Sequence, residues 1–330
     1  MRTYVRLGLL LALVLALTVL LPSPERASGT APDPPESMAA LGDSMTQAMD
    51  ADGNVYGDQP QNSWSTGTSS TVLSQYVRIL LQNRLILGNN HNDAVSGAKM
   101  ADLNGQAQNA VSQGVEYVTI LMGGNDVCTP SEETMTSVET FRSQFEEAMD
   151  TLTSGLPDAR IFVASIPDIY HLWFILHDNP IAVLVWDNAP PPYGPICQSM
   201  LADATSDAPG DVARRERVRQ RNIDFNTVLS EVCSSYDHCQ FDDNVVFNSQ
   251  FDESQVSFID YFHPSIAGQT NIARLTWDAG YGFLAPVGGV AELPDASGSA
   301  GRNYIPLAAL AAALVALSAG GWYARRRLLG

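Results

Sequence analysis

Short apolar segments alternate with longer segments of helical periodicity between residues 38 and 277 of the 330-residue chain. The segments expected as strands are 38–41, a segment containing 85–87, 115–122, 161–166 and 245–247. The segments expected as helices are 72–81, 101–113, 131–152, 212–232 and 265–277. Apolar runs without strict alternation indicate strands that are buried on both faces. The alternation therefore predicts an α/β domain in which helices cover both faces of a parallel sheet.

The composition excludes several classes of protein. Hydrophobic residues make up 45% of the chain and charged residues 16%, which is too apolar for a disordered protein. Acidic residues outnumber basic ones 36 to 18, and the resulting net charge of -18 would repel nucleic acid. With 5 His and 4 Cys, an array of zinc fingers is not expected either. We therefore expect a globular domain with no nucleic-acid partner.

The first 29 residues have the features of a secretory signal peptide. Arg2 and Arg6 supply positive charge, an apolar run follows over 7–21, and the residues at 27–29 are small. An uncleaved membrane anchor is the alternative, but the run is short for a membrane span. Residues 30–36 are then expected to form a linker that leads into a single domain over 37–285.

A second apolar run, near the C-terminus, predicts a membrane anchor. Residues 286–303 are rich in Gly, Ala and Ser and are expected to form a stalk. Residues 304–330 contain an apolar run long enough to span a bilayer, followed by three arginines. Since a basic flank favours the cytoplasmic side, we expect the domain outside the cell, secreted through the signal peptide and held at the membrane. A sortase-type sorting signal and a buried terminal helix are the alternatives.

An even number of cysteines in an extracellular protein indicates disulfides. The four cysteines can pair in three ways, or they can remain free thiols. Cys233 and Cys239 enclose a short loop, so we favour that pair. Cys128 with Cys197 would then join two segments that lie far apart in the sequence.

Four short motifs lie at or beyond the ends of expected strands, where parallel sheets carry their active sites. A serine in the turn Gly42-Asp43-Ser44 can present its hydroxyl at the edge of the sheet. Asp260 and His263 lie three residues apart, a spacing that suits a general base and its orienting carboxylate. Asn125 in Gly-Gly-Asn-Asp and Gly97 in Ser-Gly-Ala can donate hydrogen bonds to an oxyanion. Taken singly, each motif is also typical of an ordinary turn or helix cap.

Together these motifs resemble the four blocks of the SGNH, or GDSL-type, serine hydrolases, from residue 38 to about residue 277. The resemblance implies a three-layer α/β/α flavodoxin-like fold and ester hydrolysis that needs no metal or cofactor. It also implies a catalytic triad of Ser44, His263 and Asp260, and an oxyanion hole made by Ser44, Gly97 and Asn125. Four further segments resemble the phospholipase B-like branch of the family, namely 40–44, 63–67, 123–128 and 165–170.

An apolar insertion after Tyr170 bears on the substrate. Residues 172–176 and 181–186 form either a wall or docking surface for lipid or additional core over the sheet. We therefore expect a secreted, membrane-tethered hydrolase of lipid acyl esters, of the lipase or phospholipase type. One alternative is a deacetylase of cell-wall or exopolysaccharide acetyl esters, and another is a surface binding module without catalysis. A third is a metal-dependent phosphoesterase that uses Asp43, Asp126, Asp260 and His263.

Overall fold

The computed structural model of the chain describes residues 32–189 and 194–283, which belong to one compact unit. The expected signal peptide, stalk and membrane anchor, at 1–29, 286–303 and 304–330, lie outside the described residues. Within the described ranges, no helix is both long enough and apolar enough to cross a membrane.

Five parallel strands form one sheet in the order β2-β1-β3-β4-β5. The strands are β1 (Met38–Gly42), β2 (Asn90–Asn92), β3 (Tyr117–Leu121), β4 (Arg160–Val163) and β5 (Cys239–Phe241). The register of the central pair places Met38 opposite Tyr117 and Gly42 opposite Leu121. This order is that of the flavodoxin-like doubly wound sheets. In these sheets β2 is added on one side of β1, and the later strands are added on its other side.

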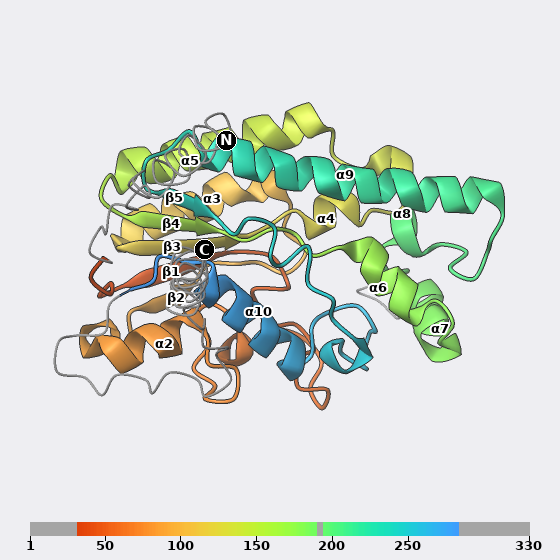
Figure 1. Ribbon diagram of the computed structural model, residues 1–330, viewed down its shortest axis with the longest axis horizontal. Coiled ribbons are helices and arrows are strands. Elements are labelled where there is room, and N and C mark those ends of the chain that lie inside the picture. Colours follow the sequence, from red (N-terminus) through yellow and green to blue (C-terminus); the bar gives the residue numbers. More distant parts are fainter. Residues whose placement is uncertain (1–31, 190–193, 284–330) are drawn as a thin grey trace, which may run out of the picture. The chain divides into compact units, whose positions relative to one another are not determined.

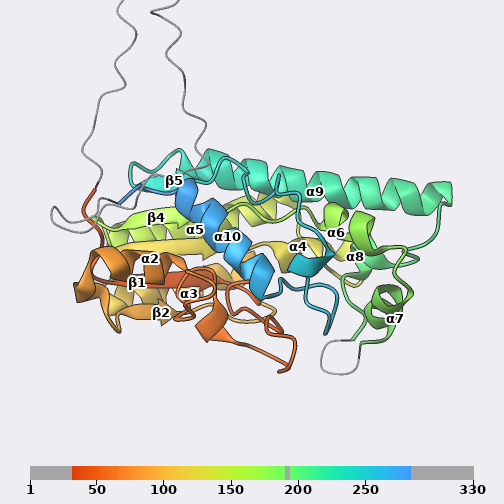
Figure 2. The same cartoon turned by 60° about the horizontal axis from the view of Figure 1, so that its bottom comes forward.

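Helices cover both faces of this sheet, as Figures 1 and 2 show. One face is covered by α3 (Met100–Gln113), α5 (Val138–Gly155) and α9 (Pro209–Cys233), and the other by α2 (Gln75–Gln82) and α10 (Ile266–Asp278). Strand β3 serves both layers, because side chains alternate along a strand. Val118 and Ile120 pack in the core of the first face, whereas Tyr117 and Leu121 pack in that of the second. The expected three-layer α/β/α fold is thus confirmed.

A group of short helices lies beyond the carboxyl ends of the strands (Figure 2). These are α4 (Gly124–Val127), α6 (Ile169–Leu176), α7 (Pro180–Asn188) and α8 (Gln198–Leu201). Four 3-10 helices complete the described part, at Pro60–Asn62, Arg84–Ile86, Glu132–Thr134 and Glu253–Gln255.

The expected strand at 85–87 is wrong. Its residues belong largely to a 3-10 helix, which the side chain of Asn83 caps by accepting a hydrogen bond from the amide of Leu85. The edge strand is instead β2, which lies further along the chain and consists of three polar residues. Two of them, Asn90 and Asn92, donate to backbone carbonyls of the loops beside β1. A polar edge strand carries no hydrophobic signal, so the search for apolar runs passed over it.

The expected strand at 245–247 is also wrong, because the chain turns there. The carboxylate of Asp242 accepts hydrogen bonds from the backbone amides of Asn244 and Val246. Asp243 and Asn244 have φ angles of 53° and 63°, which a strand does not allow. The strand of this region, β5, has already ended at Phe241.

The helix expected over 131–152 begins at Val138, seven residues later than the sequence suggested. The side chain of Ser137 accepts a hydrogen bond from the amide of Thr140 and so caps α5. The preceding residues form a separate 3-10 turn, Glu132–Thr134.

Two disulfides join the four cysteines, and no cysteine is free within the described part of the chain. Cys128 pairs with Cys197, which ties the end of α4 to the start of α8. Cys233 pairs with Cys239, which ties the end of α9 to the start of β5. The pairing favoured from the sequence is confirmed.

Candidate active site

Ser44 follows the carboxyl end of β1, at a turn that only glycine permits. Gly42 has a φ of +157°, and a Cβ atom there would lie 2.5 Å from the carbonyl oxygen of Leu121. The side-chain amide of Gln106 in α3 both donates to and accepts from the backbone of Gly42. Next, the carboxylate of Asp43 accepts a hydrogen bond from the amide of Met45. These contacts fix the backbone on both sides of Ser44.

The structure brings His263 and Asp260 to this serine, although Ser44 and His263 are 219 residues apart. Nε2 of His263 lies 2.7 Å from Oγ of Ser44, and Nδ1 lies 2.5 Å from Oδ2 of Asp260. The other oxygen of Asp260 accepts hydrogen bonds from the amides of Phe262 and His263. With its proton on Nδ1, the imidazole presents a free lone pair on Nε2 to the serine hydroxyl.

Burial and charge act in opposite directions on this pair. Burial would lower the pKa of His263, but the charge and hydrogen bond of Asp260 outweigh it and raise that pKa above its ordinary value. Burial would raise the pKa of Asp260, but His263 and two backbone amides hold it below its ordinary value. The arrangement therefore stabilises an ionised Asp260 beside an imidazole that readily accepts a proton.

Gly97 and Asn125 line the same cleft as Ser44 and His263. Gly97 has a φ of +83°, in the left-handed region that favours glycine. Asn125 stands in α4, where Nδ2 donates one hydrogen bond to the carbonyl of Ala98 at 2.9 Å and retains a second N–H. Among the described residues, no acceptor binds the backbone amides of Ser44 and Gly97. Each of the three groups therefore keeps a hydrogen-bond donor that no described residue uses.

The other two aspartates of the motifs differ in their surroundings. Asp126 accepts hydrogen bonds from the amide of Met100 and the hydroxyl of Thr136, so it joins the start of α3 to the loop before α5. Asp43 is buried, and its Oδ2 has no hydrogen-bond partner in the described part of the chain. Burial, with a smaller contribution from the nearby Asp126, raises the pKa of Asp43 to about 6, against the opposing effects of the Met45 amide and His263.

The four residues considered for a metal do not come together as one set. In the described ranges, the triplet with ligand atoms within 4.8 Å of one another is Asp50, Asp260 and His263. Asp50 is buried and accepts a hydrogen bond from the amide of Gly57. Neither Asp50 nor Gln106 was expected from the sequence, because each reaches the site through tertiary packing rather than through a motif.

Two cavities meet at Ser44. The smaller, of about 80 Å³, has a mostly apolar lining from the segment after β4, from α6 and from α10. The larger, of about 880 Å³, contains Gly97, Asp260 and His263 and extends to α7 and the Cys128–Cys197 disulfide. Ser44, Asn125 and Phe262 line both.

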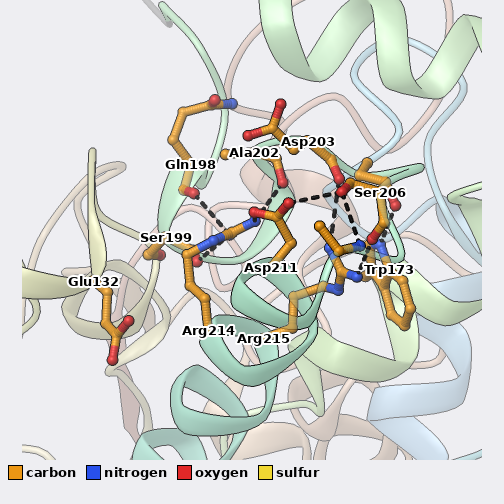
Figure 3. Close-up of polar contacts among 12 residues, drawn as sticks. Glu132, Trp173, Gln198, Ser199, Ala202, Asp203, Ser206, Asp211, Arg214 and Arg215 are labelled. Carbon is orange, nitrogen blue, oxygen red and sulfur yellow. Dashed lines mark hydrogen bonds and ion pairs between the residues drawn. The ribbon is translucent and has the colours of Figure 1, made fainter.

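Two arginines of α9 hold α6 and the segment around α8 (Figure 3). The guanidinium of Arg214 donates to backbone carbonyls around α8, including that of Ala202 at 2.6 Å. Arg215 donates to the carbonyl of Ser206 at 2.6 Å and stacks 4.4 Å from the ring centre of Trp173 in α6. Because Arg215 is almost fully buried, it fixes α6 against α9 and so keeps the wall of the site in place.

A model of the GDSL-like lipase/acylhydrolase family matches residues 38–276. The chain belongs to this family. The family shows that the protein is an ester hydrolase, as the resemblance of the motifs implied; its assignment to the phospholipase B-like branch stays a prediction.

Solved structures similar to this GDSL-like hydrolase include lipases and carbohydrate esterases. The extracellular lipase of Streptomyces rimosus is 16% identical, with 74% of this chain and 99% of that chain covered and a TM-score of 0.43. The family 3 carbohydrate esterase of Clostridium thermocellum is 15% identical, with coverages of 73% and 93% and a TM-score of 0.43. Phospholipase A1 of Streptomyces albidoflavus is 16% identical, with coverages of 74% and 98% and a TM-score of 0.41. No curated protein gives a significant match to the sequence.

Proposed function

We propose that the protein is a serine hydrolase of lipid acyl esters that acts outside the cytoplasm while tethered to the membrane. The observation that carries the proposal is the hydrogen-bonded series Ser44, His263 and Asp260 beside an apolar cavity. The two disulfides support an oxidising compartment. Export and tethering rest on the sequence of the two termini.

The hydroxyl of Ser44 is the nucleophile in this proposal. Its oxygen bonds to the ester carbonyl carbon, while its proton passes to Nε2 of His263 and an oxyanion forms. Collapse breaks the bond to the alcohol oxygen, which takes up that proton, and leaves the acyl group on Ser44. Water that gives a proton to His263 then attacks the acyl carbon, and that proton returns to Ser44 as the carboxylic acid leaves.

Asp260 and the donors of the cleft have supporting roles. Asp260 holds the imidazole in the tautomer with Nδ1 protonated and stabilises the imidazolium that forms. The amides of Ser44 and Gly97 and the side chain of Asn125 donate to the oxyanion, which carries more charge than the ester carbonyl. Donors that are already in place at this point lower the barrier rather than strengthen ground-state binding.

The surface around the larger cavity supports a lipid substrate. Tyr56 and Leu184 line this cavity and are 73% and 62% exposed. Phe174 of α6 and Ile181 of α7 are also more than half exposed, although the opposite sides of both helices are buried. The insertion is thus core on one side and apolar surface on the other, which suits contact with a lipid surface.

Product analysis tests this proposal. The full-length protein is mixed with phosphatidylcholine in detergent micelles, and Ser44→Ala serves as the blank. We expect free fatty acid together with glycerophosphocholine, and neither product in the blank. Release of acetate from acetylated polysaccharide without release of fatty acid would replace the lipid substrate with the deacetylase alternative.

Two further measurements separate the other classes. A fluorophosphonate probe should label the wild type and leave Ser44→Ala unlabelled, and no labelling of either would support a binding module instead. Lipid hydrolysis should persist in the presence of a chelator, whereas its loss would favour metal-dependent chemistry.

A further inference from the structure

The smaller cavity next to Ser44 has a wall of apolar side chains on two sides. Ile166, Ile169 and Leu172 come from the segment after β4 and from α6, and Ile272 and Leu275 come from α10. On α10, Gly268, Asn271, Ile272 and Leu275 recur at the spacing of one helix face. The cavity therefore follows α10 away from the helix end that adjoins His263.

Apart from Asp43, whose Oδ2 has no partner among the described residues, two polar side chains that line this cavity are engaged with neighbouring residues. Nδ2 of Asn271 donates to Oγ of Ser249 at 3.0 Å, and Asp168 pairs with Arg219 at 2.6 Å. A sugar hydroxyl would find few free partners on these walls, whereas a hydrocarbon chain needs none. The lining thus favours an apolar ligand.

The larger cavity has a different character. It holds His263, Asp50, Asp260 and the amide of Gly97, and it is about ten times as large as the smaller one, 880 against 80 Å³. A bulky or polar group fits there. Since Ser44 lines both cavities, an ester carbonyl at its hydroxyl would have one part of the substrate on each side.

We propose that the smaller cavity binds the acyl chain of the ester and the larger one its alcohol part, and that Leu275 of α10, in the wall of the smaller cavity, sets which acyl chain length is preferred. This inference rests on the proposed serine hydrolase function. The smaller cavity, of about 80 Å³, exceeds the roughly 10–15 Å³ that a single water needs. An acetyl group would leave part of it empty, whereas a longer acyl chain can extend along α10 toward Leu275.

Leu275 lies in the part of the wall that a longer acyl chain would reach. It lies nine residues after Ile266, the first residue of α10, which places it about 14 Å along the helix axis. It is also only partly buried, so a change of its size disturbs the core less than a change at the buried Ile272. Leu275→Trp should shorten the cavity, and Leu275→Ala should lengthen it.

The test measures kcat/KM of the full-length protein on p-nitrophenyl esters from acetate to palmitate. We expect the wild type to have its maximum at an ester with a longer acyl chain than acetate. Leu275→Trp should lower the ratio of octanoate to acetate at least tenfold, and Leu275→Ala should move the maximum to longer chains. The two variants change the size in opposite directions, so poor folding of one does not remove the test. Leu81→Trp, at a 73% exposed position on α2, is the matched control and should keep the wild-type ratio.

Three results would overturn the inference. The first is a wild-type maximum at acetate. The second is an unchanged chain-length profile in both Leu275 variants. The third is a chain-length profile that changes in Leu184→Trp but not in the Leu275 variants. Because Leu184 lines the larger cavity, the acyl chain would then lie in that cavity. The proposed function fails separately, if no ester is cleaved faster by the wild type than by Ser44→Ala.

Discussion

At the scale of single residues, the proposed chemistry depends on side chains whose protonation is affected in opposite directions by burial and by neighbouring charges. His263 is buried, which disfavours its charged form, yet three carboxylates favour that form, those of Asp260, Asp43 and Asp50. Asp43 is buried without a partner for one of its oxygens. A group whose protonation is balanced in this way responds strongly to the loss of a neighbour.

Asn125→Ala should lower turnover by about 10²–10³, because it removes one donor to the oxyanion. Nδ2 of Asn125 makes a single hydrogen bond within the described residues, to Ala98, so we expect the fold to remain. Measurement of kcat on a soluble ester, with circular dichroism of the same samples, checks both expectations. Asn104→Ala in α3 is the control, since it loses two hydrogen bonds away from the cleft, to Glu147 and from Thr151. Turnover near that of the control would contradict the oxyanion role.

The pH dependence of kcat/KM should show the raised pKa of His263. Only the neutral imidazole accepts the serine proton, so activity should be lost as pH falls through a value above the ordinary histidine pKa. Asp260→Asn removes the largest effect that raises this pKa, while burial still lowers it. We therefore expect the acidic limb of the profile to shift to lower pH, at a reduced maximum rate. If the acidic limb of Asp260→Asn lies at the same pH as that of the wild type, a group other than His263 titrates there.

Asp43 should make stability depend on pH. Its pKa is raised from 3.8 to about 6, so the folded chain binds this proton more tightly than the unfolded chain. Stability from this group is therefore present at low pH and is lost as pH rises through that range, by up to about 3 kcal/mol. Asp43→Asn should gain in free energy of unfolding relative to the wild type between pH 4 and pH 7. Urea unfolding of both proteins at pH 4 and pH 7 measures this gain. If the free energies of unfolding of variant and wild type differ by the same amount at both pH values, the prediction is contradicted.

At the scale of elements, the sequence predicts best what is local. Strands β1, β3 and β4 are buried on both faces and appear as apolar runs, whereas the polar edge strand β2 has no such signal. The expected strand at 245–247 failed because one carboxylate, that of Asp242, turns the chain. Candidate site residues in turns, such as Ser44 and His263, were found through their motifs. Gln106 and Asp50 were not, because only the packing of distant segments brings them to the site.

The two disulfides should differ in their contribution to stability. Cys128–Cys197 closes a separation of 69 residues and Cys233–Cys239 one of 6. Loop-closure entropy then gives about 4 kcal/mol for the first bond and about 2 kcal/mol for the second. Thermal unfolding of Cys128→Ala/Cys197→Ala should show the larger loss, roughly 10 °C. The second pair of substitutions is the control, and an equal or greater loss from it would contradict the argument.

At the scale of the whole molecule, the negative charge of the chain and the apolar surface near the cleft have opposite effects on binding to a lipid membrane. The chain has 36 acidic and 18 basic residues, a net charge of -18. An anionic membrane would repel such a protein over distances of about 30 Å at 0.01 M salt and about 3 Å at 1 M. The apolar contact at Phe174 and Ile181 needs no charge and is not screened.

The full-length protein, reconstituted in vesicles, should therefore hydrolyse lipid faster in neutral phosphatidylcholine than in vesicles with an anionic lipid at low salt. High salt should remove most of that difference. Phe174→Ser with Ile181→Ser should lower the ratio of vesicle to soluble-ester hydrolysis at either salt concentration, because it removes the apolar contact. Leu81→Ser, on the distant helix α2, is the control and should keep the wild-type ratio. All variants share one C-terminal segment, so a ratio unchanged by the double substitution would show that tethering alone brings the cleft to the lipid.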